Sequence, residues 1–87
     1  MPRVVFTHAV SDVQAWASHK AERAGFFEDF ATDIGDYLPT DGGSTVDVSA
    51  NVHDMEGMQA ALETPEAIAL EESHGVIPPI SSFIENQ

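Results

Sequence analysis

The chain has 87 residues, of which fifteen are acidic and three basic, so its formal net charge is −12 at pH 7. A surface of this charge repels phosphate backbones and anionic membranes, so we expect neither nucleic acid nor a membrane as partner. The length allows one domain, residues 1–87, and the lack of cysteine excludes disulfides and thiolate metal sites. No stretch approaches the roughly 20 apolar residues of a membrane span, and no signal-peptide core is present, so we interpret the chain as cytoplasmic.

The acidic excess has more than one interpretation. It is typical of a solubility device, since a large net charge keeps proteins apart. It is also typical of a halophilic cytoplasm, where lysine is scarce, and Lys20 is the only lysine in the sequence. Mimicry of a nucleic acid is a third interpretation. The dependence of folding on salt separates the first two, because screening relieves self-repulsion.

The first half of the chain predicts a strand, a helix and a second strand. Residues 3–10 are rich in β-branched and aromatic side chains, which favours a central strand. Ser11 followed by Gln14 predicts a capping box, and apolar residues at 3–4 spacing then predict a helix over 12–30, bent near Gly25. Residues 32–40 form a weaker strand pattern, typical of a sheet edge.

The second half repeats this order with clearer signals. Gly42 and Gly43 predict a tight hairpin turn, and residues 45–52 alternate between apolar and polar side chains. Asp54 is suited to cap a second helix, which we expect to restart at Thr64-Pro65 and to end at Gly75. Residues 80–85 form the last predicted strand.

The resulting order, βαββαβ, predicts an α+β fold of the ferredoxin-like type, a four-stranded antiparallel sheet with two helices on one face. The alternating valines of 45–52 should face the helices. With the turn centred on Gly42 and Gly43, Tyr37 lies opposite Val48 and is expected on the same face. The reverse face is mixed in polarity, which favours packing against a second copy as a homodimer.

Short segments along nearly the whole chain form one loose pattern. They are His8-Ala9-Val10-Ser11-Asp12 followed by Trp16, the Asp41-Gly42-Gly43 hairpin, His53-Asp54, Thr64-Pro65-Glu66, and Gly75-Val76 before a proline-containing strand. The pattern resembles the dimeric α/β-barrel superfamily, which includes antibiotic-biosynthesis monooxygenases and related small proteins of unknown function. The resemblance implies a ferredoxin-like subunit whose sheet faces a partner's sheet across a dimer.

The resemblance implies several possible activities. The superfamily includes cofactor-free oxygenases, haem-degrading enzymes, isomerases, dismutases and proteins without known activity, so the fold does not select one. Its haem-degrading members use an Asn on the first strand, where this chain has Thr7 and His8. We therefore expect no haem and no other cofactor.

Four residues are candidates for a site between sheet and helices, and each has a structural alternative. His8 is suited to act as a general base, or it is a buried histidine satisfied by its neighbours. Tyr37, Trp16 and His74 are candidate ligand-binding residues, or they serve as core filler, helix packing and a helix end. No metal is expected, because Glu71 and His74, at i and i+3, form a single pair and a metal site needs more ligands that converge.

Two functions fit these residues. One is the binding or oxidation of a small apolar or aromatic molecule in the cleft, by a cofactor-independent monooxygenase or isomerase. The other is a non-catalytic module that senses a ligand or contacts a protein. Loss of turnover in His8→Ala with the fold intact indicates the first, whereas loss of stability indicates a core role.

Overall fold

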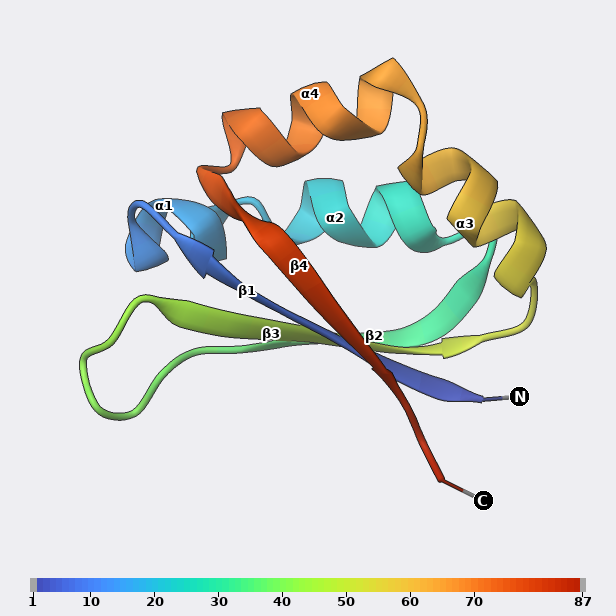
Figure 1. Cartoon of the computed structure of the whole chain (residues 1–87), viewed down its shortest axis with the longest axis horizontal. Helices are drawn as coiled ribbons and strands as arrows, with labels where there is room; N and C mark the ends of the chain where they lie inside the picture. Colours follow the sequence, from blue (N-terminus) through green and yellow to red (C-terminus); the bar gives the residue numbers. More distant parts are fainter. Residues whose placement is uncertain (1, 87) are drawn as a thin grey trace.

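The computed structural model describes residues 2–86. Its element order is β1 (Arg3–Val10), α1 (Val13–Ser18), α2 (Lys20–Phe27), β2 (Ala31–Tyr37), β3 (Thr45–Val52), α3 (Met55–Leu62), α4 (Pro65–Ser73) and β4 (Val76–Ile84) (Figure 1).

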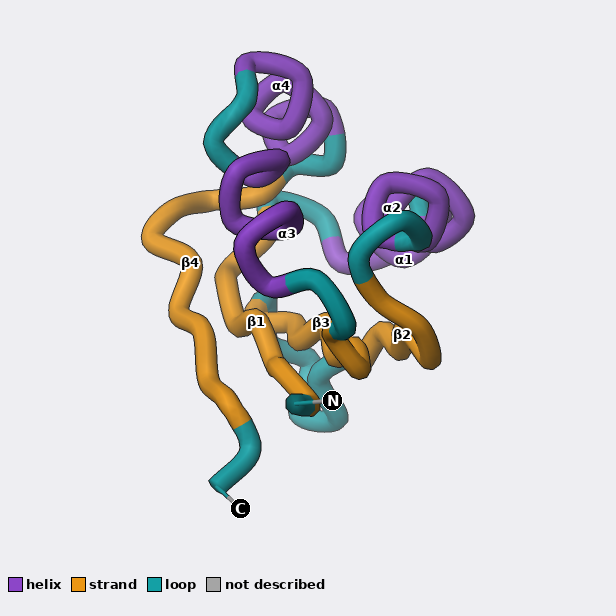
Figure 2. The backbone as a smooth tube through the Cα atoms, turned by 90° about the vertical axis from the view of Figure 1, so that its right-hand side faces the viewer, coloured by secondary structure: helices purple, strands orange, loops and turns teal. Residues whose placement is uncertain are grey.

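In the described part of the chain the strands form one four-stranded sheet in the order β2-β3-β1-β4, and every paired neighbour is antiparallel. The helices all lie on one face of the sheet, with α1 and α2 beside the pair α3 and α4 (Figure 2). This is the ferredoxin-like α+β arrangement predicted from the order of the elements.

The first helical region differs from the expected continuous helix over 12–30. It divides at His19, whose backbone N–H bonds to the carbonyl of Trp16 at 3.1 Å in a tight final turn. The expected bend near Gly25 is therefore wrong, since Gly25 lies inside α2. Asp12, not Ser11, caps the helix by accepting from the N–H of Ala15 at 3.2 Å.

The second helical region confirms the predicted restart. The Thr64 hydroxyl accepts from the N–H of Ala67 at 3.2 Å, and Pro65 occupies the first turn of α4, where its missing N–H costs nothing. Gly75 follows with φ +77°, the left-handed conformation that ends many helices. β4 starts earlier than expected, because Val76 already pairs with Val10 of β1.

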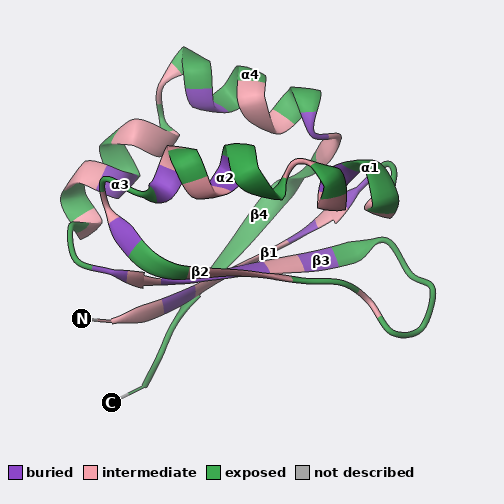
Figure 3. Ribbon diagram, turned by 180° about the vertical axis from the view of Figure 1, so that it is seen from behind, coloured by how far each residue is buried: buried purple, intermediate pink, exposed green. Residues whose placement is uncertain are grey.

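The core lies between the sheet and the helices. The valines of β3 at positions 46, 48 and 52 face the helices and are almost fully buried, as the alternation predicted. Figure 3 shows the buried residues gathered on the surfaces where the two layers meet. His8 pairs with Val46, so it shares this inward face, which confirms its expected side of β1.

The expected side of Tyr37 is wrong. Tyr37 pairs with Asp47, so it lies on the reverse face, and Asp36 lies opposite Val48 in its place. The hairpin is centred on Gly42 and not between Gly42 and Gly43, so the register differs by one residue from the expected one. Because side chains alternate along a strand, a shift of one residue moves every later side chain to the other face.

No helix among residues 2–86 is both long and apolar enough to cross a bilayer.

Candidate functional site

A cavity of about 360 Å³ lies between the inner face of the sheet and the helices. Its apolar wall includes the rings of Phe6, Phe26 and Phe27, of which Phe6 and Phe27 are stacked with centroids 6.1 Å apart. Its polar lining includes His8 from β1 and Arg23 from α2, together with other groups described below. A pocket with aromatic walls and a few convergent polar groups is the usual form of a small-molecule site.

His8 is held in a defined state on this wall. Its side chain is buried, and its Nδ1 lies 3.1 Å from the carbonyl oxygen of Ala9. A carbonyl only accepts, so Nδ1 carries the proton and Nε2 is left as the acceptor. Burial lowers the pKa of His8 below its ordinary value of 6.5, with a smaller contribution from the charge of Arg23. The ring is therefore neutral at pH 7 and able to accept a proton.

Arg23 is a cavity residue that the sequence analysis did not propose for the site. Its guanidinium carbon lies 3.7 Å from the centroid of the Trp16 ring, close enough for a cation–π contact. One of its terminal nitrogens donates to the Asp36 carboxylate at 2.6 Å, and both side chains are at least nine-tenths buried. Arg23 lies seven residues after Trp16 and four before Phe27, and this spacing places the three residues on one face of a helix, which was the sequence signal for a position facing the sheet.

His74 ends α4 and reaches the cavity. Its side chain is 2% exposed, and Nε2 donates to Glu22 of α2 at 3.1 Å. His19 stacks on it with centroids 4.3 Å apart and donates from Nδ1 to the other oxygen of Glu22 at 3.1 Å. These hydrogen bonds, first from His74 and then from His19, lower the pKa of Glu22.

His19, Glu22 and His74 are also of the types that bind zinc. A metal ion must lie near the plane of each imidazole that ligates it, yet the two rings are stacked at 14°. Both nitrogens that face Glu22 also carry the protons they donate to it, whereas a ligating nitrogen offers a lone pair. The arrangement fits a hydrogen-bonded cluster better than a metal site.

Glu71 of α4 is a further cavity residue that was not proposed for the site from sequence. Burial raises the pKa of its carboxyl group above the ordinary value. The cavity thus contains two groups, Glu71 and His8, whose environments disfavour their charged forms.

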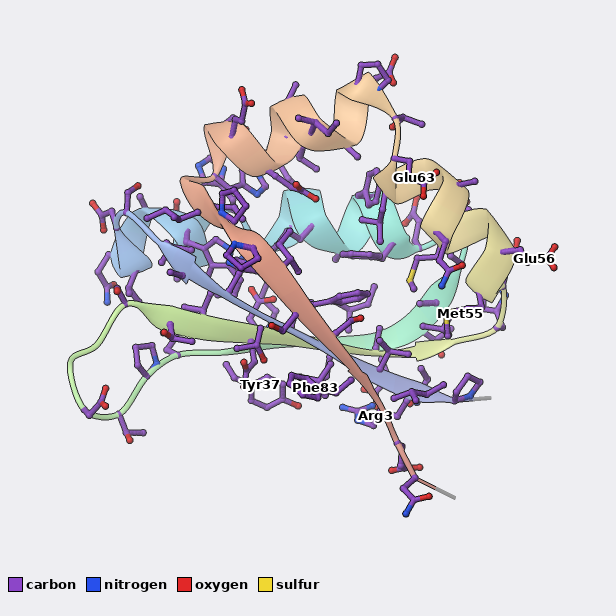
Figure 4. The ribbon with its side chains drawn as sticks, viewed as in Figure 1. Arg3, Tyr37, Met55, Glu56, Glu63 and Phe83 are labelled. Atoms are coloured by element: carbon purple, nitrogen blue, oxygen red, sulfur yellow. The ribbon has the colours of Figure 1, made fainter. Side chains whose placement is uncertain are left out.

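The cavity brings together three of the four candidate residues, His8, Trp16 and His74. Tyr37 is not among its lining residues. Its hydroxyl lies on the reverse face, where it accepts from Ser49 at 3.0 Å and from Arg3 at 3.4 Å, and these bonds lower its pKa (Figure 4). Ligand binding by Tyr37 stays a prediction, separate from this cavity.

Comparison with known proteins extends these observations. No family model matches the sequence, and no curated protein matches it. The structure is similar to SnoaB, a cofactor-independent oxygenase from Streptomyces nogalater, with a TM-score of 0.73 and 16% identity over 99% of this chain and 93% of that one. It is also similar to a Nitrosomonas europaea protein provisionally named an antibiotic biosynthesis monooxygenase, with a TM-score of 0.65 and 12% identity over 100% and 98%.

A third similar structure, from Deinococcus radiodurans, carries the same provisional name and has a TM-score of 0.63 at 12% identity, over 100% of this chain and 94% of that one. Identities this low establish the fold and not the activity. They confirm that the chain has the fold of the antibiotic biosynthesis monooxygenase-like proteins.

Proposed function

We propose that the protein binds a small aromatic molecule in the cavity and that His8 initiates its cofactor-independent oxygenation as a general base. The observation that carries this proposal is the state of His8. It is buried beside aromatic walls, with Nδ1 occupied by Ala9 and Nε2 available as acceptor at neutral pH. Trp16 and His74 also line the cavity and are proposed to contact the ligand.

The chemistry needs only these groups and dioxygen. His8 takes a proton from an acidic C–H or phenol of the substrate, which leaves an electron-rich anion. Dioxygen adds to the carbon that bears the negative charge and gives a peroxide. The O–O bond then breaks as this carbon loses its remaining hydrogen, so the carbon becomes a carbonyl and the outer oxygen leaves with the two protons as water. The similarity to SnoaB, named as a cofactor-independent oxygenase, supports this class of reaction. An isomerase would share the first step and consume no oxygen.

The test compares His8→Gln with His53→Gln, an exposed histidine after β3. Oxygen uptake is measured with a panel of phenolic and enolisable aromatic substrates, and binding and melting temperature are measured in parallel. We expect His8→Gln to abolish oxygen uptake while the protein still folds and binds, and His53→Gln to behave as the wild type. Binding without turnover by the wild type would instead support the ligand-sensing alternative.

We also propose that the chain forms a symmetric dimer through the reverse face of the sheet. Tyr37 and Phe83 lie on this face and are 48% and 60% exposed, which is high for aromatic residues. Arg3 lies beside them and bonds to Ser49 at 2.9 Å, so the surface is ordered before any partner arrives (Figure 4). A small chain gains the burial that its own core lacks from such an interface. We also propose that the protein is located in the cytoplasm.

A further inference from the structure

The carboxylate of Glu22 joins two histidines that lie at the ends of different helices. Glu22 is in the first turn of α2, and its side chain is 55% exposed. One of its oxygens accepts from Nε2 of His74 and the other accepts from Nδ1 of His19, both at 3.1 Å. An ionised carboxylate only accepts hydrogen bonds, so each of these nitrogens carries a proton. Glu22 therefore determines the position of the proton on both rings.

The other nitrogen of His74 has a partner of the opposite kind. Nδ1 lies 3.5 Å from a terminal nitrogen of Arg23, which is long for a hydrogen bond. A guanidinium only donates, so Nδ1 offers its lone pair to it. A second proton on Nδ1 would bring two donors and two positive charges together in a buried place. Both neighbours thus favour the same state of His74, a neutral ring with its proton on Nε2.

The lone pair of His74 adds to the contacts that hold Arg23 in the cavity wall. The second terminal nitrogen of the guanidinium donates to Asp36 at 2.6 Å, and its carbon lies 3.7 Å from the centroid of the Trp16 ring. A buried charge is stable only where its donors find acceptors. A chain of contacts therefore runs from the exposed Glu22 through His74 to the guanidinium and the indole ring.

We propose that Glu22 is a positioning residue of the cavity. It holds His74 in the tautomer with the proton on Nε2, and His74 in turn holds the guanidinium of Arg23 over Trp16. His8 has the opposite tautomer, with its proton on Nδ1 and its lone pair on Nε2. Because Arg23 engages the lone pair of His74, His8 is the cavity histidine that is able to take a proton from a ligand, and this consequence rests on the proposed function.

Long-range nitrogen–proton NMR of the intact protein tests this role, because the protonated and unprotonated nitrogens of a neutral imidazole resonate far apart. The spectrum is recorded at about pH 8, where a histidine with the ordinary pKa of about 6.5 is neutral. We expect the proton on Nε2 in His74 and on Nδ1 in His8 and His19. The exposed His53 should show the average of both tautomers and serves as the reference.

The variant Glu22→Gln gives the sharpest result, because an amide offers one acceptor and one donor. The buried His74 is held by Arg23 at its other nitrogen, so it should keep the side-chain oxygen and its tautomer. The amide nitrogen then faces His19, whose proton should move from Nδ1 to Nε2. A role in packing alone predicts no such reversal.

The variant Glu22→Ala should move the signals of His19 and His74 toward the average shown by His53. It should also shift the indole peak of Trp16, which lies at the far end of the chain of contacts. Glu28→Ala removes an exposed glutamate directly after α2 and is the matched control, so it should move none of these signals.

A wild-type His74 with its proton on Nδ1, or with averaged tautomers, would overturn the inference. It would also be overturned if His19 kept its tautomer in Glu22→Gln, or if Glu28→Ala moved the signals as far as Glu22→Ala does. The wild-type spectrum decides the tautomers even if a variant does not fold. A His8 without its proton on Nδ1 would instead contradict the proposed function and leave the role of Glu22 standing.

Discussion

The buried ion pair between Arg23 and Asp36 gives the sharpest prediction about stability. Their side chains are 7% and 9% exposed and their charged atoms lie 2.6 Å apart. Asp36→Asn leaves the arginine charge buried and without its counterion, which costs about 3–5 kcal/mol in comparable sites. A chain of 87 residues has a free energy of unfolding of about 4–13 kcal/mol, so the variant should lose a large fraction of it.

Urea denaturation followed by circular dichroism measures this loss, and Asp33→Asn is the matched control. Asp33 is also on β2 and also pairs with an arginine, Arg3, but at 3.4 Å and with 75% of its side chain exposed. An exposed pair is worth about 0–1 kcal/mol. Asparagine also tolerates the positive φ of 55° at this position, so the control adds no backbone strain.

The two variants should therefore differ by at least about 2 kcal/mol. Equal losses would refute the argument that the Arg23 charge is sequestered. The double variant Arg23→Met with Asp36→Leu removes both charges, and it should recover much of the stability lost in Asp36→Asn. Recovery separates an unpaired charge from a mere defect in packing.

Three further outcomes follow from charge and surface. Burial lowers the pKa of His8, so the unfolded chain binds a proton at this residue more readily than the folded protein does. The free energy of unfolding, measured by urea titration, should therefore fall as the pH drops below about 6.5, and His8→Gln should reduce this dependence on pH. The melting temperature should rise by several degrees from low salt to molar KCl, and a constant value would exclude self-repulsion as a cost of the −12 charge. Light scattering should show a dimer that Phe83→Glu dissociates and Ile68→Glu, on α4, does not.

The regular parts of the fold were predictable because local signals agreed. The alternation of residues 45–52 gave the bounds of β3 as observed, and Thr64 with Pro65 gave the start of α4. The side of His8 followed from strand periodicity alone. Its place in the cavity wall depends on how the helices cross the sheet, which periodicity does not specify.

Arg23 shows why part of the site was not predicted. An arginine in an apolar helical stripe is normally interpreted as a solvated edge, because a charge is buried only when a partner compensates it. Its partner, Asp36, lies on β2, 13 residues later in the chain, so no local sequence pattern indicates that the two side chains pair. The pair of Glu22 and His74 was still harder to predict, since their hydrogen bond joins residues 52 positions apart in the sequence.

An irregularity in β2 decides that Asp36, and not Tyr37, faces the helices. If the register that pairs Ala31 with Val52 continued unchanged along β2, Tyr37 would pair with Val46 and face the helices. The irregularity between Thr32 and Gly35 shifts the strand by one residue, so the carboxylate of Asp36 turns inward and the tyrosine turns outward.

Without this shift, Arg23 would lack its counterion and could not remain buried over the Trp16 ring. The ion pair at the polar end of the cavity thus depends on an irregularity in β2. Irregularities of this kind, such as β-bulges, often orient side chains next to active sites. With the unshifted register Gly35 would lie opposite Val48 and Tyr37 opposite Val46, so the carboxylate of Asp36 would be on the reverse face, away from Arg23.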